Sequence, residues 1–171
     1  EKNLALEIAE ITDAASGLYN HKFAVRHLEW LADYNSETKN SFAVIFADID
    51  NFKSYNDTYG MYAGDRLIEN VGKAIRKSAG REDAVCRFGG DEFIILVGNC
   101  DAEGAEKIIL KIRENMHTDI SDAVTISMGY AVYPRDGTKG SELLSEAYTR
   151  MFAEKLRRRE TGREENTFTC R

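Results

Sequence analysis

Two β-prone apolar runs separated by Gly89-Gly90 constrain the fold of this chain most strongly. Gly-Gly between such runs is typical of a hairpin turn, because glycine tolerates backbone conformations that a Cβ atom would forbid. Asp91 and Glu92 follow at once, so the hairpin would hold two carboxylates at the tip of a rigid sheet. Adjacent acids at such a place suit a hard divalent cation such as Mg²⁺. For this motif alone, a solvated acidic surface turn is the alternative.

A second acidic cluster favours the metal-binding interpretation. Residues 41–47 form a nearly continuous apolar run, which predicts a central strand buried on both faces. The run ends in Asp48-Ile49-Asp50, and carboxylates at a buried strand end are costly unless they are paired or bound to metal. If this strand neighbours the hairpin, Asp48 and Asp91 converge on one ion. Lys53 would then help to neutralise phosphate, as in sites of phosphoryl transfer.

These residues resemble the GGDEF domain family, the diguanylate cyclases, which condense two GTP molecules into cyclic di-GMP. The motif that names the family stands intact as Gly89-Gly90-Asp91-Glu92-Phe93, preceded by Arg87 and Phe88. Further stretches match the family pattern in the family's order: 12–20, 48–60, Gly64-Asp65 and 125–131. The resemblance covers nearly the whole chain, and several ordered motifs make chance a poor explanation.

Periodicity and turn signals predict an α+β fold with a central, mostly antiparallel sheet of about five strands flanked by helices. The order is βααββαβ plus a terminal helix, the ferredoxin-like arrangement of nucleotidyl cyclase palm domains that the resemblance implies. Helices are predicted over 20–37, 51–59, 62–79, 102–117 and 140–160. Strands are predicted over 41–48, 83–88, 92–97, 123–132 and, as a short last strand, 166–170. A connector helix over 1–13 precedes one catalytic domain over 14–171.

Composition bounds the class of protein. The 171 residues, 43% of them hydrophobic, fit one globular domain, and a net charge of −6 argues against binding a nucleic acid polymer. No apolar run is long enough to span a membrane, so no membrane contact is expected from this segment. The cysteines follow no metal or disulfide pattern, which predicts a cytoplasmic location, either alone or as the cytoplasmic part of a larger membrane-bound sensor. Because the chain begins at Glu1 inside a predicted helix, an upstream sensor domain is expected; a plain packing helix is the alternative.

The resemblance implies a role for each candidate site residue. Mg²⁺, or Mn²⁺, would be held by Asp48, the carbonyl of Ile49, Asp91 and Glu92. The catalytic residues would be Asp91, Lys53 and Glu92, with Asp91 assisting loss of the attacking 3′-hydroxyl proton. GTP would be bound by Lys53, Asn56, Met61, Asp65, Arg87, Lys155 and Arg159. Ordinary surface positions are the alternative for Lys53 and Glu92, and a structural ion pair for Arg87.

Within that set, Asn56 and Asp65 would recognise guanine. An amide pairs with the acceptors of the base, and a carboxylate accepts from N1–H and the exocyclic amine. Adenine lacks that pair of donors, so a site built around Asp65 should reject ATP. A helix N-terminal acid favoured by the helix dipole is the alternative for Asp65, and both can hold together.

Three positions depart from the family pattern. Met61 stands where histidine is usual, and a thioether cannot donate a hydrogen bond. The product-inhibition motif, arginine-x-x-aspartate, has Gly80 in place of the arginine and ends in Asp83, which predicts that this site is absent or weak. Around Lys155, Arg150 and Glu154 replace small residues, so a longer or shifted last helix is an open alternative that bears on Lys155 and Arg159.

The predicted function is therefore a diguanylate cyclase that binds GTP and works as a homodimer of half-sites, with release of pyrophosphate. One alternative is a non-catalytic module that binds GTP or a partner protein as a regulatory domain. Another is a cyclase that makes a different nucleotide product, against which Asp65 argues.

Overall fold

The computed structural model describes residues 8–121 and 123–167. The elements after the first short helix follow in this order: α2 (His21–Thr38), β1 (Phe42–Ile49), α3 (Phe52–Tyr59), α4 (Met61–Ser78), β2 (Ala84–Arg87), β3 (Glu92–Gly98), α5 (Ala102–Asp119), β4 (Ile126–Tyr133) and α6 (Gly140–Thr167). From β1 to β4 this is the predicted βααββαβ order, and the α+β class is confirmed. Within the described ranges, no helix has the length and apolar character needed to cross a membrane.

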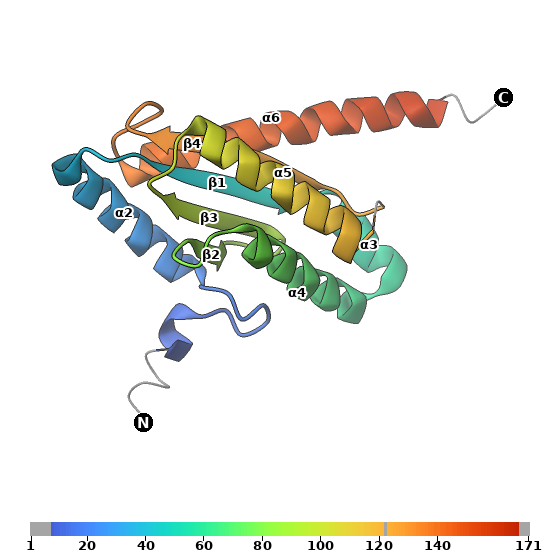
Figure 1. Ribbon diagram of the computed structural model, residues 1–171. Coiled ribbons are helices and arrows are strands. Elements are labelled where there is room, and N and C mark those ends of the chain that lie inside the picture. The colour runs from blue at the N-terminus through green and yellow to red at the C-terminus, as the bar shows by residue number, and fades with distance from the viewer. Residues whose placement is uncertain (1–7, 122, 168–171) are drawn as a thin grey trace.

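Strand β1 lies inside an antiparallel sheet with the order β2-β3-β1-β4 (Figure 1). Every residue of β1 is buried, as the apolar run predicted for a central strand. The described residues place four strands in this sheet, where about five were expected. Residues 166–167 of the strand predicted over 166–170 continue α6 instead, and the remaining three lie outside the described residues.

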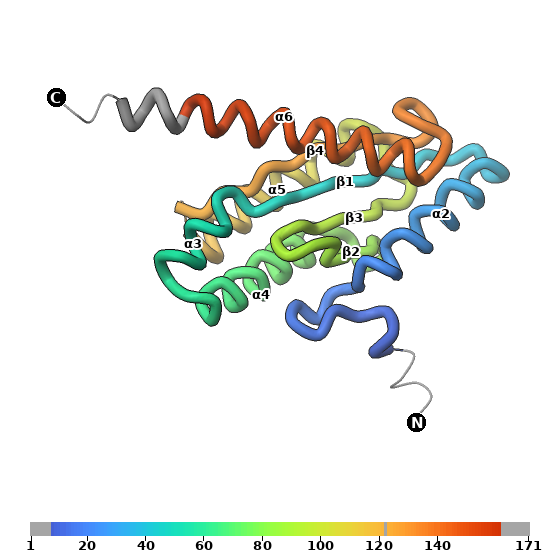
Figure 2. Tube along the Cα trace, turned by 180° about the vertical axis from the view of Figure 1, so that it is seen from behind, coloured from blue at the N-terminus to red at the C-terminus, as the bar shows by residue number. Residues whose placement is uncertain are grey.

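Helices cover both faces of the sheet, and the two views agree on the layers (Figures 1 and 2). Helices α4 and α5 lie on one face and α2 and α6 on the other. The side chains of β1 alternate between the two cores: Ala43 and Ile45 belong to the core under α4 and α5, whereas Phe42 and Val44 belong to the core under α2 and α6. Burial on both sides explains why β1 has an apolar run rather than an alternating pattern.

Three helix boundaries can be compared with the prediction. The predicted connector helix stops at Ile11, and Thr12 instead pairs with Tyr19 across a turn; residues 1–7 of that prediction lie outside the described residues. Helix α2 begins as predicted at Asn20, whose side-chain oxygen accepts a hydrogen bond from the Phe23 N–H (2.9 Å). Helix α6 continues beyond the predicted residue 160, because its arginine and glutamate residues are good helix formers.

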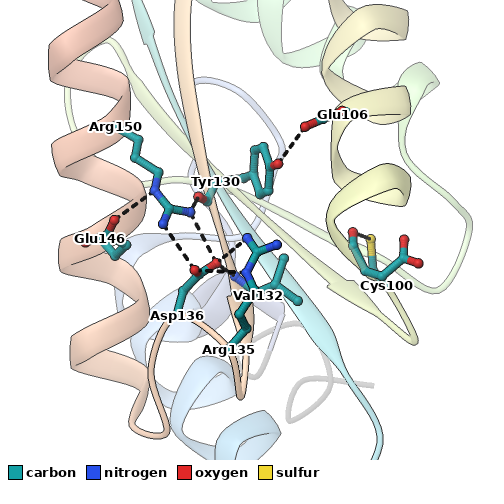
Figure 3. Close-up of polar contacts among 9 residues, drawn as sticks. Cys100, Glu106, Tyr130, Val132, Arg135, Asp136, Glu146 and Arg150 are labelled. Atoms are coloured by element: carbon teal, nitrogen blue, oxygen red, sulfur yellow. Dashed lines mark hydrogen bonds and ion pairs between the residues drawn. The ribbon is translucent and has the colours of Figure 1, made fainter.

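Carboxylates satisfy backbone groups along the sheet edge at β4. Asp136 accepts a hydrogen bond from the Val132 N–H (2.8 Å) and pairs with the guanidinium groups of Arg135 and Arg150, as Figure 3 shows. Arg150 also donates to the carbonyl of Tyr130 (2.7 Å), which ties α6 to β4. Burial alone would raise the pKa of Asp136, but the hydrogen bonds from both guanidinium groups and the backbone N–H outweigh burial and lower it.

Replacing Asp136 with asparagine is expected to destabilise the fold by about 2 kcal/mol at neutral pH, since hydrogen bonds to a charged group are lost. The folded pKa of Asp136 lies below its unfolded value, so its contribution is complete above an unfolded pKa of about 3.9 and shrinks as the pH falls below it. Urea unfolding of both proteins at pH 7 and pH 3 should therefore give a smaller difference at pH 3. An equal difference at the two pH values would contradict the ionic role of Asp136.

Candidate nucleotide and metal site

The sheet register brings the predicted acidic residues together. Asp48, near the end of β1, lies directly opposite Glu92, the first residue of β3. The Ile49 N–H donates to the carbonyl of Asp91 (3.1 Å), which fixes the β2–β3 turn beside the end of β1. The convergence of Asp48, Asp91 and Glu92 was expected only if β1 neighboured the hairpin, and in the structure it does.

The turn itself uses its glycines differently from the prediction. Neither Gly89 nor Gly90 has a positive φ. A Cβ atom on Gly89 would lie 2.3 Å from the Glu92 carboxylate, whereas one on Gly90 would meet nothing within 4 Å. Gly89 therefore leaves space for the Glu92 carboxylate at its present position, and does not serve a left-handed conformation. The turn closes through hydrogen bonds from the N–H groups of Phe88 and Gly89 to the Glu92 carbonyl (2.8 and 3.3 Å).

Arg87 braces this turn. Its guanidinium donates to the carbonyl of Gly90 (2.8 Å) and pairs with Asp13 (3.1 Å). Burial would raise the pKa of Asp13, but hydrogen bonds from Ser16 and Arg87 outweigh burial and lower it. These contacts favour the structural alternative for Arg87, since they hold the hairpin against the segment before α2.

Lys155 reaches the acidic cluster from α6. Its ammonium group donates to the Asp48 carboxylate, and the two side chains are only 14% and 9% exposed. Burial raises the pKa of Asp48, and the negative charge of Asp91 adds to that effect, while Lys155 opposes it. Burial and the neighbouring Asp48 and Asp91 also raise the pKa of Glu92. Negative charge is thus concentrated beyond what one lysine neutralises.

The donor set fits a magnesium ion shared with a nucleotide. Within the described ranges, no three His, Cys, Asp or Glu side chains are arranged to hold an ion by themselves. Mg²⁺ commonly uses one or two carboxylates and completes its shell with water and substrate phosphates. Asp48 and Asp91 can supply those carboxylates. Asp50 is engaged elsewhere, because the hydroxyls of Thr125 (2.7 Å) and Ser127 (2.6 Å) donate to it.

Asn56 and Gly64 lie against each other where α3 packs on α4. A Cβ atom on Gly64 would lie 1.7 Å from the side-chain oxygen of Asn56, so glycine leaves room for the amide. That oxygen is buried and has no hydrogen-bond partner in the described part of the chain. Asp65 follows Gly64 on α4 and is exposed. Among residues 8–121 and 123–167, the pair offers an unmatched acceptor beside a carboxylate without a hydrogen-bond partner, as a donor-rich base would require.

Within the described part of the chain, no hydrogen bond or ion pair joins Lys53, Met61 or Arg159 to the acids. Lys53 on α3 and Arg159 on α6 are exposed, and Met61 at the start of α4 is 78% exposed. At the position of the product-inhibition motif, the side chain of Asp83 accepts a hydrogen bond from the Gly80 N–H (2.6 Å). Asp83 thus caps its own turn where an arginine-x-x-aspartate motif would present both side chains.

Sequence reasoning named two further carboxylates, Glu154 and Asp50, but missed the contacts through which they shape the site. Glu154 accepts a hydrogen bond from the Met128 N–H (2.6 Å) and pairs with Arg113 (2.7 Å), which anchors α6 to β4 one residue before Lys155. Asp50 was treated as part of the acidic cluster, although it is held by β4. The alternating hydroxyls at 125 and 127 are a signal for that contact, but only once β4 is known to neighbour β1.

The family described as "Diguanylate cyclase, GGDEF domain" matches residues 10–161. The chain belongs to the GGDEF domain family. The diguanylate cyclase TpbB of Pseudomonas aeruginosa is 32% identical over 173 residues, covering 95% of this chain and 39% of that protein. Diguanylate cyclase A of Treponema denticola is 33% identical over 143 residues, covering 79% of this chain and 38% of that protein.

Solved GGDEF structures share the fold. The isolated GGDEF domain of TpbB from Pseudomonas aeruginosa superposes with a TM-score of 0.80 at 29% identity, covering 85% of this chain and 89% of that one. Other relatives of this GGDEF domain are named as cyclic di-GMP phosphodiesterases, such as PdeR of Escherichia coli, which is 31% identical over 88% of this chain and 23% of that protein. The chain spans less than half the length of these curated relatives.

Proposed function

We propose that this GGDEF domain is a diguanylate cyclase that condenses two GTP molecules into cyclic di-GMP. The observation that carries the proposal is the convergence of Asp48, Asp91 and Glu92, with Lys155 donating to the first of them. A buried acidic cluster that retains one cation is suited to binding a metal–triphosphate complex, in which metal and lysine share the neutralisation of charge. Family membership and the cyclases among the relatives support the same activity.

In this proposal Mg²⁺, or Mn²⁺, is held by Asp48, the Ile49 carbonyl and Asp91, with Glu92 in support. The bound ion supplies positive charge at the phosphates and makes the nearby hydroxyl more acidic. Asp91 accepts the proton of the 3′-hydroxyl of one GTP. The oxygen of that hydroxyl attacks the α-phosphorus of the other GTP. The bond from that phosphorus to the bridging oxygen of pyrophosphate breaks, and a second such reaction closes the ring.

Three cationic side chains contact the nucleotide phosphates in this proposal. Lys155, which now donates to Asp48, would contact the nucleotide phosphates, and Lys53 and Arg159 would approach them from the exposed sides of α3 and α6. Because each copy binds one GTP, two copies must face each other, and catalysis requires a homodimer. We place the reaction in the cytoplasm, with an upstream sensor domain that regulates how often two half-sites meet.

Guanine is recognised by Asn56 and Asp65 in this scheme, with Met61 contributing no hydrogen bond. The sequence led us to expect Asn56 to pair with acceptors of the base, but the unmatched atom is its oxygen, which is available to the second N–H of the exocyclic amine. The Asp65 carboxylate accepts from N1–H and the first N–H of that amine. ATP presents a different edge and leaves these acceptors unpaired, so the site should discriminate against it.

The decisive experiment incubates the domain with GTP and Mg²⁺, both alone and fused to a leucine zipper that enforces dimers. Cyclic di-GMP is measured by mass spectrometry, with Asp91→Ala as the control. Product from the fused wild type that disappears in Asp91→Ala would support the cyclase. GTP binding without product in the fused dimer would overturn the cyclase and support a non-catalytic GTP-binding module, the alternative that Met61 favours.

Replacing Gly64 with alanine tests the recognition of the base. The new Cβ atom would displace the Asn56 amide, so GTP affinity should fall about tenfold, or about 1.4 kcal/mol. Folding stability should not fall, because the amide is a movable side-chain end and alanine favours a helix over glycine by about 1 kcal/mol. Calorimetric GTP titration and thermal unfolding measure the two effects. Unchanged GTP affinity would show that the Asn56 amide does not contact the base.

A further inference from the structure

Helix α2 presents an aromatic stripe on its outer side. Phe23, His27, Trp30 and Tyr34 follow one another at helical spacing, and their rings stack in sequence with centroids 5.2, 5.4 and 5.1 Å apart. Trp30 is 53% exposed and Tyr34 is 49% exposed, although both are large aromatic residues. Phe23 and His27 are half-buried, so the row becomes exposed at Trp30 and Tyr34, and exposed stacked rings on one helix indicate a surface that a partner covers.

A row of charges runs beside this aromatic stripe. Lys22 and Arg26 occupy the first half of α2, and Glu29, Asp33 and Glu37 occupy the second half. All five side chains are exposed, and none of them takes part in an ion pair within the described part of the chain. The opposite flank of the stripe is buried against the domain through Ala24, Leu28, Leu31 and Asn35. The open flank of the stripe is therefore basic at one end and acidic at the other.

We propose that α2 is a self-association surface on which a second copy of this chain docks with its own α2 antiparallel. The charged row is symmetric about a point between Glu29 and Trp30, and the aromatic row about a point one residue earlier, between Leu28 and Glu29. Turning one helix end for end about that point places Phe23 opposite Tyr34 and His27 opposite Trp30 of the second copy. The same operation places Lys22 and Arg26 of each copy against the segment of the other that carries Asp33 and Glu37, while the two copies of Glu29 meet near the symmetry point.

Charge complementarity selects a second copy over other partners. An acidic partner helix would be attracted by Lys22 and Arg26 but repelled by Asp33 and Glu37, and a basic partner would meet the reverse. Only a partner with the same row in the opposite direction matches both halves, and this chain supplies that row. Like charges placed opposite each other also disfavour a parallel arrangement of the two helices.

The shape of the surface agrees with this arrangement. A hollow of about 340 Å³ lies between Glu10-Ile11 and α2, and Phe23, His27 and Trp30 form part of its wall. Tyr34, which does not line the hollow, is 49% exposed further along α2. An antiparallel partner brings its Tyr34 ring to this hollow, and the two-fold axis repeats the contact on the other copy. In Figure 2, α2 runs along one border of the molecule, next to the segment that precedes it.

Sedimentation velocity over a range of concentrations tests the interface. The wild-type chain should dimerise, and the double variants Lys22→Glu/Arg26→Glu and Glu29→Lys/Asp33→Lys should each weaken dimerisation at least about tenfold. Mixing the two variants should restore it as a heterodimer, because opposite charges then face each other. Tyr62→Ser, which changes a residue 78% exposed on another helix, should dimerise as wild type does. A wild type that stays monomeric, or a dimer that neither charge reversal weakens, would overturn the proposal.

Disulfide trapping tests the antiparallel direction. In a Cys170→Ser background the two other thiols, Cys86 and Cys100, are buried. Glu29→Cys lies next to the symmetry point and should cross-link between copies, whereas Glu37→Cys residues would lie about 25 Å apart along the axis, given 1.5 Å of rise per residue. Cross-linking of both positions would indicate parallel helices and overturn the arrangement. The proposal is independent of the cyclase reaction, so Asp91→Ala protein should associate as wild type does.

Discussion

Replacing Asp48 with asparagine is expected to lower cyclic di-GMP formation by the zipper-fused dimer at least about a hundredfold, the scale of losing one preorganised electrostatic contact in an active site. Asparagine keeps the shape of the side chain but loses the charge that Lys155 and Mg²⁺ share in the proposed site. The carboxylate is buried, so solvent cannot replace it. Product formation by mass spectrometry and thermal unfolding of the same sample separate a lost site from a lost fold.

The matched control for this change is Asp50→Asn, two residues further along the same segment. Asp50 is held by the hydroxyls of Thr125 and Ser127, which can also donate to an amide oxygen, so its loss of activity should be much smaller. A second control, Asp48→Asn with Lys155→Met, removes the lysine left without its partner and should recover stability without recovering activity. Equal losses of cyclic di-GMP formation in Asp48→Asn and Asp50→Asn would show that Asp48 has no special role in binding the metal.

The sequence predicted those parts of the site that depend on strand order and burial. The apolar run before Asp48 could only be a strand covered on both faces, and the Gly89-Gly90 turn could only close a hairpin. Once β1 pairs with β3, the meeting of Asp48 with Glu92 follows from register alone. The helix positions followed from hydrophobic periodicity and from the Asn20 cap. Both are local properties of the chain, so they can be recognised without knowing the tertiary contacts.

The parts that could not be predicted depend on contacts between distant segments. The engagement of Asp50 requires β4 beside β1, and the commitment of Arg87 to Asp13 joins residues far apart in sequence. Gly89 was expected to provide a positive φ, although its role is to leave space for Glu92, which no local pattern encodes. Helix α6 runs past the predicted end at residue 160, which agrees with the longer last helix that the sequence left open as an alternative.

The close approach of the α6 backbone to Gly129 was also not predicted. Gly129→Ala is expected to destabilise the fold by about 3 kcal/mol, at the upper end of the usual cost of overpacking. A Cβ atom there would lie 2.2 Å from the backbone nitrogen of Met151 and 2.5 Å from the carbonyl oxygen of Ala147. These are backbone atoms of α6, so no side-chain rotation relieves the clash and the helix must move from β4. The melting temperature should fall by about 6–12 °C for a domain of this size.

The same movement should reach the site, because α6 carries Lys155 to Asp48. Gly129→Ala is therefore expected to lower cyclic di-GMP formation even at temperatures where the domain remains folded, whereas Gly98→Ala should change neither property. Gly98 ends β3, has no positive φ and would place its new Cβ in open space, so its effect should stay within about 0.5 kcal/mol. If Gly129→Ala melted as wild type does, α6 would have to pack on β4 less closely than the structure indicates. If it melted early but kept full activity, the position of Lys155 would not depend on that packing.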